Sequence, residues 1–137
     1  MRTHIEFRTD KFPAYPDEEE KINPGRWGQR LSEYLQVKLK EHGITTNPSI
    51  GFEDWGCIVN LMGTPFDMWI GCGNYEEYSD GHMCFIEPSK STIWKFPFKR
   101  IDTTTEVNRI ADVLEKILKS DPDIRAVSWW AEGQNES

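Results

Sequence analysis

The chain has 137 residues, of which 37% are hydrophobic and 12% aromatic, and 16 Lys and Arg against 23 Asp and Glu give a net charge of −7. This length fits one domain, and the aromatic content excludes a disordered chain. The acidic balance argues against direct binding to nucleic acid or to an anionic membrane, because both favour a basic protein surface. We therefore expect one folded domain over residues 1–137.

The first predicted elements are a strand, an acidic loop and a helix. Residues 2–8 alternate between apolar and polar side chains, which predicts a half-buried strand. Residues 10–22 contain two prolines and the run Asp17-Glu-Glu-Glu20, which predict a surface loop. Asn23-Pro24 is typical of a helix start and Gly43 of a helix end. The apolar stripe of this helix comprises Trp27, Leu31, Tyr34, Leu35 and Leu39.

The middle of the chain reads as β structure. The predicted strands cover residues 44–52, 55–62, 66–72 and 83–87, with a tight turn at 63–65 and a polar connection from Gly73 to Gly81. Residues 93–98 predict an edge strand, because Pro97 has no backbone N–H to donate to a neighbour.

A second helix and a last strand complete the pattern. Residues 104–119 form an apolar stripe, and Thr103 with Glu106 has the spacing of a capping box. Asp121-Pro122 ends this helix, residues 124–130 predict a strand, and 131–137 a frayed polar tail. The fold class is therefore α+β, with a mostly antiparallel sheet of five to six strands and two amphipathic helices on one face.

Cysteine usage bears on compartment and metal binding. The odd set Cys57, Cys72 and Cys84 argues against a secreted disulfide framework, and the N-terminus lacks the apolar run of a signal peptide, so we expect a cytoplasmic protein. Structural zinc sites bring their ligands in close pairs, whereas here only His82 and Cys84 are close. We therefore predict no metal, no cofactor and no intrachain disulfide.

No catalytic residues are predicted. His82 and Cys84 lie on one face of a strand, but a buried thiol beside a histidine is usually inert. Glu53 and Asp54 are adjacent in sequence and point to opposite faces, so they are poorly placed to cooperate. A small enzyme or ligand-binding protein with a polar pocket near these four residues remains the alternative.

The directions of the tryptophan side chains bear on where a contact surface would lie. Trp69 falls on the strand face opposite Met68 and Ile70, and the consecutive Trp129 and Trp130 point to opposite faces. At least one Trp should therefore lie away from the helix-covered core, either packed beneath a loop or in contact with a partner.

Three segments of the chain resemble a sequence pattern found in other proteins. The run Asn23-Pro-Gly-Arg-Trp-Gly28, the run Phe52-Glu-Asp-Trp-Gly56 and the closing Asp121–Arg125 with Trp129-Trp130 resemble a pattern in small uncharacterised bacterial proteins. In size and charge the chain is also similar to immunity proteins, antitoxins and phage-encoded anti-defence (anti-CRISPR-like) inhibitors. This second similarity is an analogy, and it implies an inhibitory role.

The leading hypothesis is a non-enzymatic, acidic protein-binding module that neutralises a toxin or a nucleic-acid-handling complex. Its partner would have a basic surface, with no direct contact to nucleic acid or membrane. The alternatives are the polar-pocket enzyme or ligand-binding protein and a structural subunit that forms a homodimer through a sheet face. The expected partner-binding residues are Asp17, Glu18, Glu19, Glu20, Glu76, Glu77, Asp80, Trp69 and Trp129.

Overall fold

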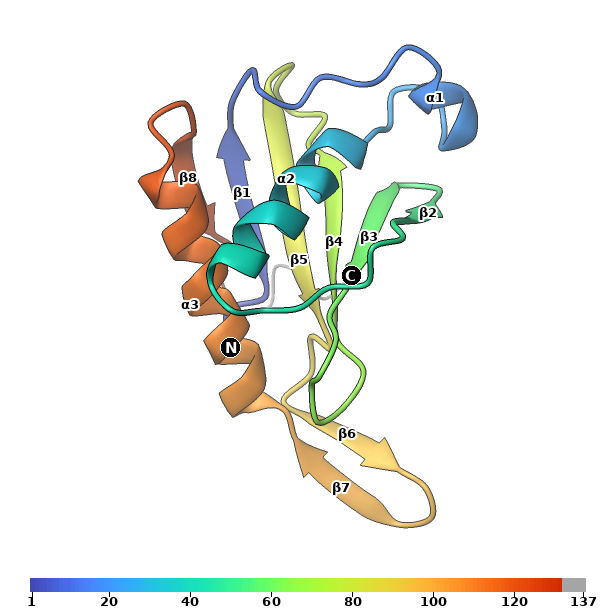
Figure 1. Cartoon of the computed structure of the whole chain (residues 1–137), viewed down its shortest axis with the longest axis vertical. Coiled ribbons are helices and arrows are strands. Elements are labelled where there is room, and N and C mark those ends of the chain that lie inside the picture. The colour runs from blue at the N-terminus through green and yellow to red at the C-terminus, as the bar shows by residue number, and fades with distance from the viewer. Residues whose placement is uncertain (132–137) are drawn as a thin grey trace.

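The computed structural model describes residues 1–131, so the expected tail, apart from Ala131, lies outside the described residues. The main-sheet strands are β1 (His4–Arg8), β2 (Gly51–Glu53), β3 (Gly56–Asn60), β4 (Trp69–Asn74), β5 (Gly81–Glu87) and β8 (Arg125–Trp129). Within the described range they form a six-stranded antiparallel sheet in the order β2-β3-β4-β5-β1-β8 (Figure 1).

The helices are α1 (Glu18–Lys21), α2 (Gln29–Glu41) and α3 (Thr104–Ser120). Both long helices pack on the same face of the sheet, α2 over β3 and β4 and α3 over β5 and β8 (Figure 1). The α+β class and its helix placement are therefore confirmed. No helix within residues 1–131 has the length and apolarity needed to span a lipid bilayer.

The strand register decides which side chains meet the helices. Cys57, Cys72, Cys84 and Ile5 are paired in one row across four strands, and all four are fully buried. Because successive side chains point to opposite faces, their neighbours in sequence form a second row on the other face. The core is completed by the apolar stripes of the helices, which include Leu31, Leu35, Leu39, Val107, Ile110, Leu114 and Leu118.

The start of α2 differs from the prediction. Asn23-Pro24 does not begin the helix, because the Arg26 amide closes a tight turn on the Asn23 carbonyl at 3.0 Å. Trp27 then pairs its backbone with Asn74, so helical geometry begins only at Gln29. The predicted helix end at Gly43 agrees with the last helical residue, Glu41.

The predicted edge strand over residues 93–98 is wrong in detail. The segment forms a separate two-stranded hairpin, β6 (Thr92–Lys95) and β7 (Lys99–Asp102), that projects from one end of the molecule (Figure 1). Pro97 lies in the turn of this hairpin, where no ladder hydrogen bond is needed.

Two smaller expectations are also corrected. The strand over residues 44–52 is reduced to β2, preceded by an isolated bridge between Thr46 and Leu61. The capping box is not formed, because the Thr103 hydroxyl donates to the Lys90 carbonyl, while Asp102 accepts from the Thr104 amide at 2.8 Å.

Candidate functional site: the aromatic face of the sheet

The sheet face opposite α2 and α3 carries connected aromatic and imidazole rings. We call this surface the aromatic face. Neighbouring ring centroids lie 4.9–6.5 Å apart, within the range of favourable ring pairs. Its rings are Trp55, Trp69, Phe85, His4, Trp130, Tyr75 and Tyr78. These residues come from distant parts of the chain, and the strand order brings them side by side.

Phe85 on the central strand β5 is the hub of the aromatic face. Its ring lies 4.9 Å from Trp55, 5.6 Å from Trp69 and 5.2 Å from His4. The same ring lies over Gly71 of β4, where an added Cβ would meet it at 2.3 Å. Gly71 therefore provides the space in which the Phe85 ring packs flat against the sheet.

His4 connects the two halves of the aromatic face. It stacks on Phe85 on one side and on Trp130 at 5.1 Å on the other, while its Nδ1 lies 2.9 Å from the Thr3 hydroxyl. Burial lowers the pKa of His4, which keeps the imidazole neutral at pH 7. A neutral ring can stack between the other two without bringing a charge into the centre of the face.

A small hollow lies at one side of the aromatic face. Its volume is about 140 Å³, and its lining includes Glu6, Arg8, Tyr75, Tyr78 and Ala126. The Arg8 guanidinium covers the Tyr78 ring at 4.3 Å, and Tyr78 remains 41% exposed. Ala126 has a φ of 56°, a left-handed conformation that costs about 1 kcal/mol or more for a residue with a Cβ. The strained residue sits where the pairing of β1 with β8 shifts register.

Fixed polar contacts surround this hollow. The Arg8 Nε donates to Asp80 at 2.8 Å, and Arg125 pairs with the second oxygen of the same carboxylate. The hydrogen bond from Arg8 lowers the pKa of Asp80, and a hydrogen bond to Glu77 raises the pKa of Tyr75 to about 12. Asp80 is thus held by two arginines, with only 11% of its side chain exposed.

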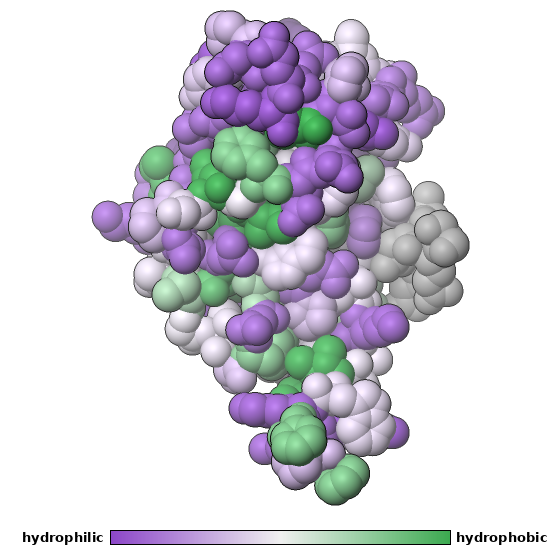
Figure 2. Space-filling view, turned by 90° about the vertical axis from the view of Figure 1, so that its right-hand side faces the viewer, coloured by the Kyte–Doolittle hydropathy of each residue, from purple (hydrophilic) through white to green (hydrophobic). Residues whose placement is uncertain are grey.

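The two predicted acidic loops lie at the same end of the molecule, where the turn that follows the first loop contacts the second (Figure 1). Asn74, at the start of the second loop, donates to the Gly25 carbonyl at 2.9 Å, and Arg26 pairs with Glu76 at 3.2 Å. Figure 2 shows hydrophilic residues gathered at this end of the molecule. The exposed carboxylates from both loops are Asp17, Glu19, Glu20, Glu76 and Glu77.

Glu18 is the exception, and its prediction as a surface residue is wrong. Its side chain is fully buried, and its Oε2 accepts hydrogen bonds at 2.7 Å from the amides of Gly28 and Gln29 at the start of α2. A carboxylate there satisfies amides that the first helical turn leaves unpaired. At Gly28 an added Cβ would lie 2.1 Å from the Cys72 carbonyl oxygen, so this glycine lets α2 begin close to β4.

The predicted tryptophans separate between the two faces. Trp69 lies on the aromatic face, stacked with Trp55 at 6.3 Å. Trp129 instead points to the helix side, where its Nε1 donates to Glu115 of α3 at 2.7 Å. Trp130, and not the expected contact residue Trp129, lies on the aromatic face, and its Nε1 donates to Glu6 at 3.1 Å.

The structure does not bring together the polar groups of the alternative pocket. Glu53 and Asp54 are exposed at the turn between β2 and β3. His82 and Cys84 are buried on β5, which is separated from β2 by two strands. Burial raises the pKa of Cys84 well above its usual value and that of Cys57 to about 12, which keeps both thiols protonated. No cluster of three or more potential metal ligands occurs in the part of the chain that the structure describes.

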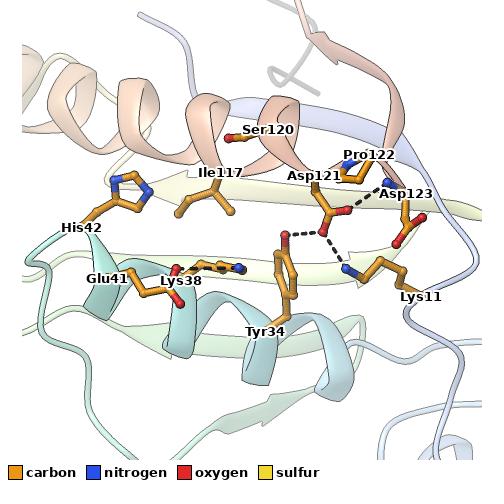
Figure 3. Close-up of a pocket in the computed structure, with 10 residues that line it drawn as sticks. All are labelled: Lys11, Tyr34, Lys38, Glu41, His42, Ile117, Ser120, Asp121, Pro122 and Asp123. Carbon is orange, nitrogen blue, oxygen red and sulfur yellow. Dashed lines mark hydrogen bonds and ion pairs between the residues drawn. The ribbon is translucent and has the colours of Figure 1, made fainter.

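A second hollow lies between the ends of α2 and α3 (Figure 3), and it is organised by Asp121. This carboxylate accepts from Lys11 at 2.6 Å and from the Tyr34 hydroxyl at 2.7 Å. Burial alone would raise the pKa of Asp121, but the hydrogen bonds from Lys11 and Tyr34 outweigh that effect and hold it at about 2. The hydrogen bonds from Lys11 and Tyr34 both end on the Asp121 carboxylate. These bonds therefore connect α2 and the end of α3 to the segment after β1.

Comparison with known proteins adds no assignment: no family model, no curated protein and no solved structure matches the chain.

Proposed function

We propose that this protein is a non-enzymatic binding module that inhibits or neutralises a protein partner, as immunity proteins do, and that the partner docks on the aromatic face. The observation that carries the proposal is the continuous set of stacked rings on the sheet face opposite both long helices. Trp and Tyr are enriched among the residues that dominate binding energy at protein interfaces. Rings that already support one another lose little conformational entropy on binding.

The acidic end supplies the second part of the proposal. Glu76 and Glu77 are exposed and directly follow Tyr75 of the aromatic face. Asp17, Glu19 and Glu20 are exposed at the same end of the molecule (Figure 1). Clustered charge of one sign accelerates encounter with a surface of the opposite sign. The favoured partner is therefore a protein with a basic surface around an apolar contact area.

The burial of the cysteines and of His82 supports a binding role over a catalytic one. Cys57, Cys72 and Cys84 are buried, whereas reactive cysteines need exposure and a lowered pKa. His82 is 4% exposed, and its Nε2 lies 3.3 Å from the Thr9 carbonyl. Self-association through the aromatic face is the second candidate, because an aromatic sheet face also suits pairing with a second copy.

Association kinetics with the captured host partner test the proposal. The variant Glu19→Lys/Glu20→Lys should associate more slowly, and its rate should depend less on added salt. The control Glu41→Lys/Asp67→Lys makes the same charge change at exposed sites outside the acidic loops and should keep the wild-type rate. Equal association rates in all three proteins would contradict the role of the acidic loops in attracting the partner. A concentration-dependent dimer that is weakened by Trp130→Ala would favour self-association.

A further inference from the structure

The β6–β7 hairpin exposes large aromatic side chains at its tip. Phe96 is 95% exposed, Phe98 90% and Trp94 68%. Soluble proteins rarely present such side chains together unless the patch makes a contact. Figure 2 shows hydrophobic surface at the end of the molecule where the hairpin projects, away from the hydrophilic end formed by the acidic loops.

The same hairpin carries an excess of positive charge. Residues 92–102 contain Lys95, Lys99 and Arg100 against one acidic residue, Asp102 at the root. The hairpin therefore carries a charge of +2 within a chain whose net charge is −7. The Arg100 guanidinium lies over the Trp94 ring at 4.9 Å, which keeps a positive charge next to the aromatic surface.

The root of the hairpin is fixed to the domain. The Thr103 amide donates to the Ser91 carbonyl at 2.9 Å, its hydroxyl donates to the Lys90 carbonyl, and Thr103 is fully buried at the start of α3. The hairpin thus projects as a two-stranded extension with a convex tip (Figure 1).

We propose that this hairpin is a peripheral membrane anchor that inserts its aromatic tip into the headgroup region of an anionic lipid bilayer. Aromatic side chains favour the membrane–water interface, and Lys and Arg next to them are attracted to anionic headgroups while their stems lie along the apolar boundary. A convex tip suits a deformable lipid surface. The proposal is independent of the proposed function, since it concerns where the protein acts.

The overall acidity does not oppose this contact, although it led us to expect none. The acidic loops lie at the end of the molecule opposite the hairpin (Figure 1). Repulsion between exposed charges is largely screened beyond about 8–10 Å at physiological ionic strength. The membrane would therefore experience the local charge of the hairpin and not the average charge of the chain.

Vesicle co-sedimentation tests the proposal. Wild-type protein should sediment with vesicles of phosphatidylcholine and phosphatidylglycerol and stay in solution with phosphatidylcholine alone. Phe96→Ser/Phe98→Ser should lower the partition coefficient roughly tenfold or more, because two aromatic rings no longer leave water. Lys95→Glu/Lys99→Glu should lower it by a similar factor, because two charges next to the lipid are reversed.

Matched controls keep the result interpretable. Phe52→Ser removes an exposed ring from β2, and Lys40→Glu/Lys116→Glu reverses two exposed charges on the helices, so both should bind vesicles as the wild type does. Thermal unfolding should be unchanged in all variants, because the altered side chains are exposed. Absence of wild-type binding to anionic vesicles, or full binding by the hairpin variants, would overturn the proposal. Binding to a single-stranded oligonucleotide without vesicle binding would overturn it in favour of a nucleic-acid contact.

Discussion

Phe7 and Phe85 lie on opposite faces of the sheet. Phe7 of β1 is 1% exposed and belongs to the core between the sheet and the helices α2 and α3. Phe85 of the adjacent β5 packs among half-buried rings on the aromatic face. The two residues have the same side chain and lie on paired strands. The first side chain fills a closed space, and the second lies among rings that are only half-buried. Stability should therefore depend mainly on the covered face and partner binding on the aromatic face.

The largest expected effect is on the covered face. Phe7→Ala should lower the free energy of unfolding by about 3–5 kcal/mol, because it leaves a cavity in a closely packed core. Denaturant unfolding followed by circular dichroism measures this loss. A cost below about 1 kcal/mol would place Phe7 outside the stabilising core.

The charge of Asp121, on the same side of the molecule, should also contribute to stability. Asp121→Asn should cost about 2 kcal/mol at pH 7, because a carboxyl whose pKa is lowered to about 2 stabilises the folded state while it is ionised. This contribution is complete above the usual pKa of 3.8 and is lost as the pH falls through about 2. The difference between wild type and variant should therefore shrink on acidification. A difference independent of pH would show that the charge of Asp121 is not the cause.

The smallest stability effect is expected on the aromatic face. Phe85→Ala should cost about 1–2 kcal/mol, because the ring is partly exposed and loses mainly its pairwise ring contacts. The same variant should weaken partner binding by about 2 kcal/mol or more, the loss expected of a residue at the centre of an interface. A stability loss equal to that of Phe7→Ala, with binding unchanged, would remove the distinction between the two faces.

The sequence was most informative where a local pattern carried the structure. The stripe from Val107 to Leu118 predicted α3, and the alternation in residues 2–8 predicted β1, because both follow from side-chain periodicity. The position of Glu18 depends on a contact with amides ten and eleven residues later, which no local pattern reveals. Asn23-Pro24 led to a wrong helix start, because Asn and Pro are favoured both in tight turns and at the beginning of helices, and here they form a turn.

The candidate site was only partly visible in the sequence. Trp69 and the opposite directions of Trp129 and Trp130 were evident from alternation, but which of the latter two meets the helices depends on strand register. The contributions of His4, Phe85 and Gly71 required the strand order β4-β5-β1, which is set by long-range pairing. The separation between acidic end and basic hairpin likewise became apparent only when the chain was folded.

Site-specific photocrosslinking in the native host can show whether a partner docks on the aromatic face. A photoreactive phenylalanine analogue is placed at Tyr78, which is 41% exposed beside the hollow of the aromatic face, or at Val37, which is 59% exposed on α2. We expect one discrete adduct with a basic protein from the Tyr78 position and none from Val37. An adduct with that protein from Val37 and not from Tyr78 would contradict the claim that partners dock on the aromatic face.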